Sequence, residues 1–148
     1  MRIAVIADTH NHLPGSLLAA IAGADEIWHL GDVTEPRIIL EVVALGRPLK
    51  VVRGNCDSYP AWPAMLDFPV AGLKIRLVHI PPTLAPEGTD LLLHGHTHVP
   101  RRELVGGTWF LNPGCITRPN RGAPSSFAWL TLAEGEEFKW EVHPLPKL

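Results

Sequence analysis

The chain has 148 residues and a formal net charge of −2, from 13 lysines and arginines against 15 acidic residues. Apolar residues make up 46% of it, which is enough for one hydrophobic core and argues against intrinsic disorder. Two cysteines are too few for a disulfide scaffold, and no apolar run approaches the roughly 18 residues of a membrane span. We therefore expect one soluble, cytoplasmic domain over residues 1–148, without membrane contact. Because no long block of basic residues occurs, nucleic acid is not expected as a partner.

The first third of the chain alternates between short apolar runs and helical patterns. Residues 2–7 are apolar without alternation, which is typical of a strand buried on both faces. Pro14 suits the first turn of a helix, and Gly46 suits the end of another. The order of elements predicts a parallel sheet with right-handed crossovers. The predicted elements are strands 2–7, 26–30 and 49–52 and helices 14–22 and 35–45.

The remainder of the chain is predicted to be mainly β. Gly106-Gly107 is a two-residue hairpin signal, and Glu134-Gly135-Glu136 marks a second turn near the end of the chain. Two proline- and glycine-containing segments, about 80–88 and 116–126, are predicted to be irregular loops. The predicted strands are 73–78, 90–93, 102–105, 108–111, 126–132 and 138–142.

Polar residues follow the predicted strands at the points where the strands end. In open α/β sheets that edge is where ligands bind. The side chains there offer oxygen and imidazole but no thiol, a set that suits Mn, Fe, Co, Ni or Zn rather than a structural zinc site built on cysteines. Seven ligands are too many for one ion, but two ions can share them if a carboxylate bridges. The seven residues are Asp8, His10, Asp32, Asn55, His79, His96 and His98.

Each fragment of this set has an ordinary interpretation when taken alone. Asp-x-His is a common solvated turn, Gly-Asp and Gly-Asn are common turns or caps, and His79 could be a buried histidine with a local partner. Gly95-His96-Thr97-His98 is stronger, although such a pattern alone is a false positive about half the time. The fragments together, in this order and each at a strand end, are much harder to obtain by chance. Two ions about 3.5–4 Å apart are a known device for displacement at phosphorus.

Six short motifs occur in order along the chain: Asp8-Thr9-His10, Gly31-Asp32, Gly54-Asn55-Cys56-Asp57, His79, Gly95-His96-Thr97-His98 and Asn112-Pro113-Gly114. This series resembles that of the calcineurin-like metallophosphoesterase superfamily, and within it the small single-domain prokaryotic phosphodiesterases of the Gly-Asn-Cys-Asp type. The resemblance covers residues 1 to about 121. It implies an α/β fold (α+β in some schemes) in which two β-sheets form a sandwich flanked by helices.

The resemblance also implies a role for each matching residue. Asp32, which lies on the middle one of the three strand ends, is the expected bridge between two divalent ions, with Mn as the first expectation. Catalysis is expected to run through the ions and their ligands, among them Asp8, Asp32, Asn55 and His96, by attack of a bridging hydroxide on a phosphate ester. The expected ligands of one ion are Asp8, His10 and His98, and those of the other are Asn55, His79 and His96.

The chain departs from the larger relatives at Cys56, where they carry a histidine that helps the leaving group depart. A thiol is a poor proton donor to an alkoxide, so a preference for good leaving groups or for diesters is expected. Asp57 would then have no imidazole to orient and is expected to cap its turn, while Cys56 itself could simply be a small buried filler. His79-Ile80 replaces the usual His-Gly, and Cys115 replaces the usual serine of the Asn-Pro-Gly-Ser motif.

Other residues are candidates for contacts with substrate. Arg118 and Cys56 are expected beside the substrate phosphate. His12 is expected at the rim of the site, with a side chain that simply faces water as the alternative. Arg121 could equally be a solvated surface arginine, and Trp62 could wall the substrate pocket. His29 is expected to be a packed strand residue, and Gly95 is expected to turn His94 away from the site.

Two spacings predict an open, shallow site for a small phosphate ester. Only 24 positions separate Asn55 from His79, and 17 separate His79 from His96, so neither gap holds a capping domain. A phosphomonoesterase or nucleotide phosphatase using the same site is the alternative enzyme, and a nuclease is less favoured because no basic face is evident. A non-catalytic scaffold, like the retromer subunit of this superfamily, is the alternative without chemistry. Exposed edge strands leave a homo-oligomer open.

Overall fold

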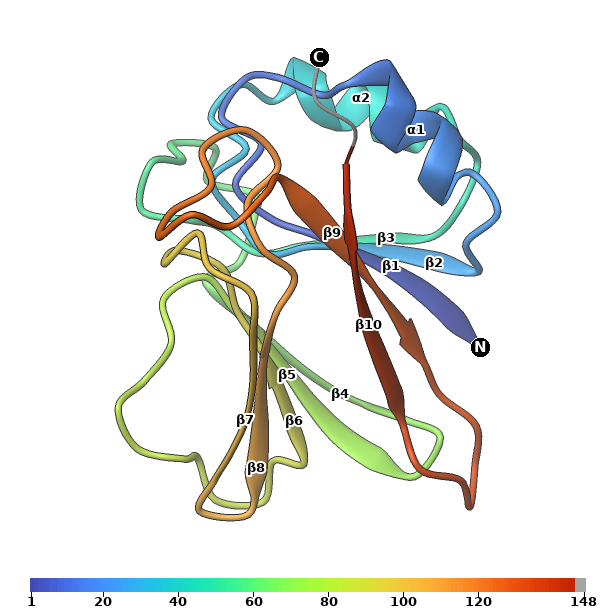
Figure 1. Ribbon diagram of the computed structural model, residues 1–148, viewed down its shortest axis with the longest axis vertical. Coiled ribbons are helices and arrows are strands. Elements are labelled where there is room, and N and C mark those ends of the chain that lie inside the picture. Colours follow the sequence, from blue (N-terminus) through green and yellow to red (C-terminus); the bar gives the residue numbers. More distant parts are fainter. Residues whose placement is uncertain (146–148) are drawn as a thin grey trace.

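The computed structural model describes residues 1–145 and shows two β-sheets packed face to face, with two helices on the outer face of one of them (Figure 1). The expected two-sheet sandwich flanked by helices is confirmed. The helices are α1 (Gly15–Ile21) and α2 (Arg37–Val43), each preceded by a proline. The first sheet consists, in spatial order, of β10 (Lys139–Pro144), β9 (Ser126–Thr131), β1 (Arg2–Ile6), β2 (Glu26–His29) and β3 (Leu49–Val51).

The second sheet carries the mainly β part of the chain. Its central strands run parallel, and its two outer pairs are antiparallel. In spatial order it consists of β4 (Met65–Val70), β5 (Leu73–Val78), β6 (Leu91–Leu93), β8 (Thr108–Asn112) and β7 (Arg101–Val105).

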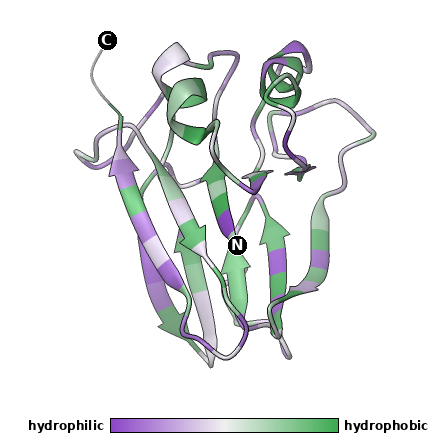
Figure 2. Cartoon of the chain, turned by 90° about the vertical axis from the view of Figure 1, so that its right-hand side faces the viewer, coloured by the Kyte–Doolittle hydropathy of each residue, from purple (hydrophilic) through white to green (hydrophobic). Residues whose placement is uncertain are grey.

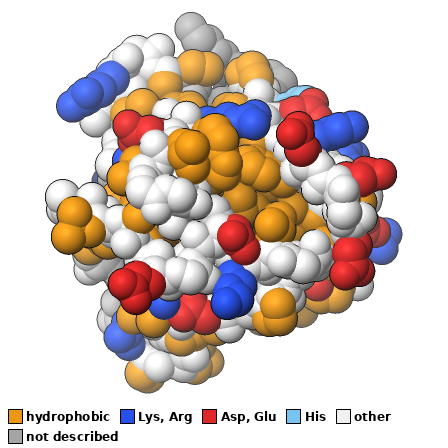
Figure 3. All heavy atoms as spheres, turned by 90° about the horizontal axis from the view of Figure 1, so that it is seen from below, with side chains coloured by type: hydrophobic (Ala, Val, Ile, Leu, Met, Phe, Trp, Pro, Cys, Tyr) orange, Lys and Arg blue, Asp and Glu red, His pale blue; other side chains and the backbone are white. Residues whose placement is uncertain are grey.

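The central strands of the first sheet are buried on both faces, which explains the uninterrupted apolar run of β1. Ile3 and Val5 point into the layer between the two sheets, whereas Ala4 and Ile6 pack against the helices. Both faces of β1 therefore lie in apolar surroundings, as expected for a central strand of a layered fold. Figure 2 shows apolar colour along the central strands and a mixed pattern on the strand at the end of the sheet. Apolar side chains also gather on the face seen from below (Figure 3).

One strand was not predicted from the sequence, and the others end within about two residues of their predicted ends. The missed strand is β4, whose Leu66, Phe68 and Val70 pack on the core between the sheets while the alternate positions face outward. This period-two pattern was present in the sequence. Pro69 obscured it, because proline is tolerated mainly on edge strands, and β4 is an edge strand.

The described residues include no helix that is long and apolar enough to cross a membrane. The helices of the fold have seven residues each and bury one face on the first sheet.

The layer between the sheets is expected to supply most of the stability. Leu130 of β9 is fully buried there, whereas Leu104 of β7 is 55% exposed. We expect Leu130→Ala to lower the free energy of unfolding by about 2–5 kcal/mol, because it removes buried methyl groups and leaves a cavity. Leu104→Ala, the matched control, should lower it by less than about 1 kcal/mol. Denaturant unfolding followed by circular dichroism measures both, and equal losses would contradict the assignment of the core.

Candidate metal centre

The seven residues singled out from the sequence all lie in loops that follow strands, at the edge where the two sheets meet. Asp8 and His10 follow β1, Asp32 follows β2, and Asn55 follows β3. The remaining three residues belong to the second sheet. His79 follows β5, and His96 and His98 follow β6. The structure therefore brings together side chains that are up to 90 positions apart in the sequence.

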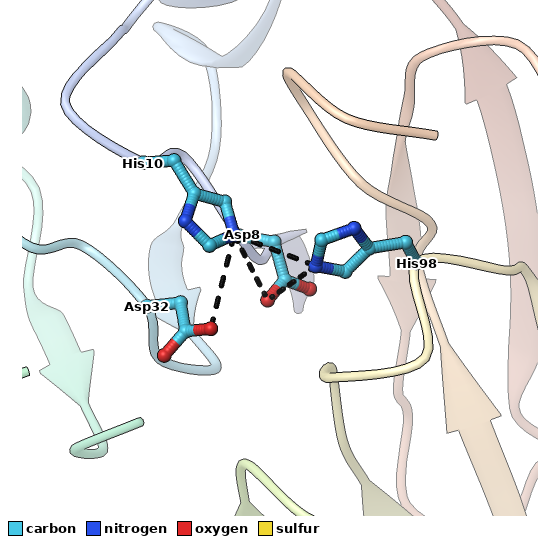
Figure 4. Close-up of side chains that lie close together, drawn as sticks. All are labelled: Asp8, His10, Asp32 and His98. Carbon is cyan, nitrogen blue, oxygen red and sulfur yellow. Dashed lines mark hydrogen bonds and ion pairs between the residues drawn. The ribbon is translucent and has the colours of Figure 1, made fainter. Parts of the chain in front are cut away.

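One group of side chains surrounds Asp8 (Figure 4). His10 Nε2 lies 3.9 Å from Asp8 Oδ1, and His98 Nε2 lies 3.4 Å from the same oxygen. The two imidazole nitrogens are 3.4 Å apart. Asp8, His10, Asp32 and His98 each offer a ligand atom within 4.8 Å of the others. Ligands about 2.0–2.2 Å from a common ion have separations of this order, so the group fits a metal.

A second group lies on the other side of Asp32. His96 Nδ1 is 3.1 Å from Asn55 Oδ1, and the rings of His79 and His96 meet edge to face with centroids 5.2 Å apart. His79 Nε2 is 3.2 Å from Asp32 Oδ2 and 3.8 Å from Asp8 Oδ1. Asp32 Oδ2 also lies 3.8 Å from His10 Nε2, so this carboxylate faces both groups.

The hydrogen bonds of two histidines determine which ring nitrogen is free. His79 Nδ1 donates to the carbonyl of Leu30 at 2.8 Å, and His98 Nδ1 donates to the carbonyl of Arg118 at 2.7 Å. With the proton on Nδ1, each neutral ring turns the lone pair of Nε2 toward a carboxylate. This orientation, fixed by a carbonyl behind the ring, is typical of histidines that bind metals.

Two buried atoms in the centre lack a hydrogen-bond partner among the described residues: Asp8 Oδ1 and His79 Nε2. Both present lone pairs, and they lie 3.8 Å apart. A cation between them would satisfy both, since unpartnered buried acceptors are strongly unfavourable. These two unpartnered atoms therefore indicate that the donor set fits divalent metal ions.

The electrostatics of the two carboxylates differ. Burial raises the pKa of Asp8 to about 6, against the lowering effect of His79 and His98. Burial would raise the pKa of Asp32 too, but His79 and the backbone N–H of Cys56 hold it below the usual range. For His79, burial is outweighed by the two carboxylates, and its pKa is raised. Asp8 is thus the carboxylate whose charge is least compensated by protein groups.

The backbone is strained where these ligands sit. Five of the seven candidate ligands have a positive φ, a conformation that residues other than glycine seldom adopt. Glycine is required where the loops after β2 and β3 touch, because a Cβ on Gly54 would lie 2.2 Å from Asp32 Oδ1. The five residues are Asp8, His10, Asp32, His96 and His98.

Asp57 joins the loops after β2 and β3. Its Oδ2 accepts hydrogen bonds from the backbone N–H of Asp32 at 2.9 Å and of Gly54 at 2.7 Å, and its Oδ1 accepts one from Thr34 N–H at 2.7 Å. The expectation that Asp57 caps its turn is confirmed. Its carboxylate also fixes the backbone of Asp32, and so positions the side chain that faces both groups.

Behind the other loops lie polar residues that hold them. Asn112 Nδ2 donates to the carbonyl of Gly95 and to Thr97 Oγ1, so this side chain shapes the loop that carries His96 and His98. His94 is buried and points away from the centre, where Arg101 donates to its Nε2 at 3.2 Å. Gly95 turns the chain as expected, and burial lowers the pKa of His94 to about 4.

His29 has a role beyond the strand packing expected of it. It is buried in β2, accepts a hydrogen bond from Gly31 N–H at 3.1 Å, and its Nε2 lies 3.0 Å from Thr9 Oγ1. Burial lowers its pKa to about 3, so the ring is neutral. It thereby links the loop after β1 to the loop after β2. The position two residues before Gly31-Asp32 was the only sequence signal for it.

The predicted substrate contacts have different outcomes. Cys56 is exposed beside the centre rather than a buried filler, and its N–H donates to Asp32 Oδ1. Arg118 is exposed. Burial lowers the pKa of His10, and the nearby charge of Arg118 lowers it further, against the raising effect of Asp32. His12 is exposed and lines a separate cavity of about 450 Å³. The expectation for Trp62 was wrong: its side chain packs in the core under the helices, where the ring of Tyr59 meets it edge to face.

The model of the family described as the calcineurin-like phosphoesterase superfamily domain matches residues 1–135. The chain belongs to this superfamily. It is a metal-dependent phosphoesterase, as its named relatives also indicate. The resemblance stated from the motifs is thereby confirmed.

Two curated relatives cover nearly the whole phosphoesterase. A probable metallophosphoesterase of Methanothermobacter thermautotrophicus is 31% identical over 96% of this chain and 91% of its own length. Phosphodiesterase YfcE of Escherichia coli is 29% identical over 88% and 87%, and its solved structure superimposes with a TM-score of 0.73 at 26% identity over 88% of each chain. Vps29 of Entamoeba histolytica, in complex with Zn²⁺, has a TM-score of 0.78 over 97% and 98%, but at 23% identity it shows only the shared fold.

A substitution at Asp57, which is not one of the candidate ligands, tests how the loops of the phosphoesterase control its affinity for metal. We expect Asp57→Ala to weaken Mn²⁺ or Zn²⁺ binding by about 10- to 100-fold, because Asp32 loses the carboxylate that fixes its backbone. Asp90→Ala is the matched control, since Asp90 accepts a single hydrogen bond from Lys74 N–H at the far end of the sheet. Calorimetric titration measures the affinity, and an unchanged value in Asp57→Ala would contradict the positioning role.

Proposed function

We propose that the phosphoesterase is a phosphodiesterase that uses two divalent metal ions, with Mn²⁺ as the first expectation and Fe, Co, Ni or Zn as alternatives. The observation that carries this proposal is the arrangement of two ligand groups around Asp32. Asp32 Oδ2 lies 3.2 Å from His79 Nε2 in one group and 3.8 Å from His10 Nε2 in the other. A single ion would leave one of the two groups without a partner.

The residues that would hold the ions follow from the two groups. Asp8, His10 and His98 form the first set of ligands, and Asn55, His79 and His96 form the second, with Asp32 shared. When bound, such ions lower the pKa of water toward neutrality and neutralise the oxygens of a phosphoryl group. The contribution of the chain is to hold seven donor atoms in place, through the carbonyls behind His79 and His98 and the carboxylate of Asp57.

Arg118 is proposed to contact the phosphate of the substrate. Its carbonyl fixes His98, and its exposed side chain lies close enough to affect the pKa of His10. An arginine at this position can donate two parallel hydrogen bonds to phosphate oxygens. His12, which lines the neighbouring cavity, would then contact the substrate beyond the phosphate.

The surroundings of Cys56 support diesters over monoesters with poor leaving groups. Burial and the charge of Asp32 raise the pKa of the thiol, which makes it a weaker acid. Asp57 already accepts three backbone hydrogen bonds, so it has little capacity left to orient a proton donor. YfcE of Escherichia coli, a relative over most of the chain, is named a phosphodiesterase. A phosphomonoesterase with the same centre is the alternative, and the rates on p-nitrophenyl phosphate and bis(p-nitrophenyl) phosphate under matched conditions distinguish the two.

The first test uses bis(p-nitrophenyl) phosphate with added Mn²⁺. We expect Asp32→Asn to lower kcat/KM by more than about a hundredfold while the circular dichroism spectrum is unchanged, because both ligand groups lose their shared carboxylate. Asp67→Asn is the control, since Asp67 pairs with Arg76 on the exposed face of β4. Metal analysis of the loaded wild type should give two ions per chain. Full activity in Asp32→Asn, or one ion per chain in an active enzyme, would contradict the proposal.

The second test concerns the leaving group. We expect kcat/KM to fall steeply across a series of aryl and alkyl diesters as the pKa of the leaving alcohol rises, because no side chain protonates it. Cys56→Ala should follow the same line within about threefold, whereas loss of a true general acid costs about 10²–10⁴-fold. A selective loss of that size on poor leaving groups in Cys56→Ala would show that the thiol donates the proton.

A further inference from the structure

We propose that the cavity beside His96 is a subsite for an anionic substituent of the phosphodiester, and that Arg121 is its specificity-determining residue. This inference rests on the proposed phosphodiesterase function and adds a substrate class to it. The substrate would be a diester in which one of the two alcohols carries a carboxylate or a further phosphate. The neutral or cationic counterpart of such a diester would bind less well.

The location of the cavity connects it with the metal centre. It has a volume of about 510 Å³, and His96, Thr97, Asn120 and Arg121 are among the residues that line it. His96 is exposed and lies 3.1 Å from Asn55 Oδ1, so the cavity opens directly beside one of the two ligand groups. A phosphate held at the centre would therefore place one of its two substituents in this cavity.

Arg121 is held at the cavity by its neighbour Asn120. The N–H of Asn120 donates to the carbonyl of His98 at 3.1 Å, and its Nδ2 donates to the carbonyl of Thr97 at 3.4 Å. Asn120 Oδ1 in turn accepts the N–H of Arg121 at 2.9 Å. The loop that carries Arg121 is thus attached to the loop that carries two candidate ligands, so the backbone of Arg121 keeps a fixed relation to the centre.

Arg121 lies at the tip of a tight turn. Its φ is 51° and that of Gly122 is 76°, and the N–H of Ala123 donates to the carbonyl of Asn120 at 3.0 Å. Positive φ at both central residues is the geometry of a type I′ turn. This turn presents Arg121 at the cavity with its side chain exposed.

The second arginine of the cavity has its charge compensated. Arg101 pairs with Glu103, donates to His94 Nε2 and lies over the ring of Phe110 at 4.6 Å. Arg121 has no such acidic partner in the part of the chain that the structure describes. The positive charge of Arg101 is therefore compensated by its neighbours, whereas the positive charge of Arg121 is available to a ligand in the cavity.

The remaining lining defines the shape of the substituent. Val99 and Pro100 are apolar and line the same cavity, so the chain linking the phosphate to the distal anion can be aliphatic or aromatic. The side chain of Asn120 is engaged with the backbone, which leaves Arg121 as the charged contact. A distal carboxylate or phosphate would pair with it by charge-assisted hydrogen bonds.

The test compares matched p-nitrophenyl phosphodiesters whose second alcohol is neutral (ethyl), cationic (choline) or anionic (3-hydroxypropanoate or 2-phosphoethyl). We expect wild-type kcat/KM, with Mn²⁺, to favour both anionic esters over the ethyl ester by about tenfold at low salt. Arg121→Gln should abolish this preference and keep the rate on the ethyl ester. Arg47→Gln removes the same charge from the turn before β3, at the opposite ends of the strands, and should leave the preference intact.

Binding supplies a readout that does not depend on turnover. Calorimetry with Mn²⁺-loaded protein should give tighter binding of 2-carboxyethylphosphonate than of propylphosphonate, which has the same length without the charge. Arg121→Gln should make the two equal. A preference retained in Arg121→Gln, or an equal loss on all esters, would overturn the subsite while leaving the phosphodiesterase proposal standing. Wild type without activity on any diester but with the calorimetric difference would overturn the function and keep the anion subsite.

Discussion

The centre depends on lone pairs that converge without protons between them. Asp8 Oδ1 and His79 Nε2 are buried 3.8 Å apart, and neither has a hydrogen-bond partner among the described residues. Nδ1 of His79 donates to the carbonyl of Leu30, so in the neutral ring the lone pair of Nε2 faces the carboxylates of Asp8 and Asp32. A cation is the group that suits both atoms, and the rest of the edge is built to keep them in this relation.

Holding these lone pairs close together is unfavourable for the folded state, and hydrogen bonds between the loops offset that cost. Positive φ angles at Asp8, Asp32 and His98 and the raised pKa of Asp8 all disfavour this arrangement in the absence of a ligand. Against them act hydrogen bonds that the loops cannot lose separately, above all those of Asp57 and His29, which join successive loops. Binding energy from metal ions would thus be transmitted to the folded state as a whole.

The parts of the fold and of the centre that could be predicted from the sequence are those with a signal in the local sequence. The strand ends after β1, β2 and β3 follow from uninterrupted apolar runs, and the meeting of Asp8, Asp32 and Asn55 follows from their parallel order. The approach of the second sheet does not, because nothing local to His79 or His96 says which edge they face. That part came from the resemblance to a family. Trp62 was misplaced for the same reason: a tryptophan near a site and one packed beneath the helices have the same local sequence.

The two sheets contribute unequal halves of the centre, and this division has a mechanical consequence. Loops of the first sheet carry Asp8, His10, Asp32 and Asn55, and loops of the second carry the three remaining histidines. Contacts such as His79 with Asp32 and His98 with Asp8 therefore cross from one sheet to the other. The layer between the sheets is apolar, and its close packing holds the two sheets together, whereas the contacts at this edge are polar and directional. A displacement of one sheet relative to the other would therefore separate ligands of the same group, so the geometry of the site depends on the alignment of the two sheets.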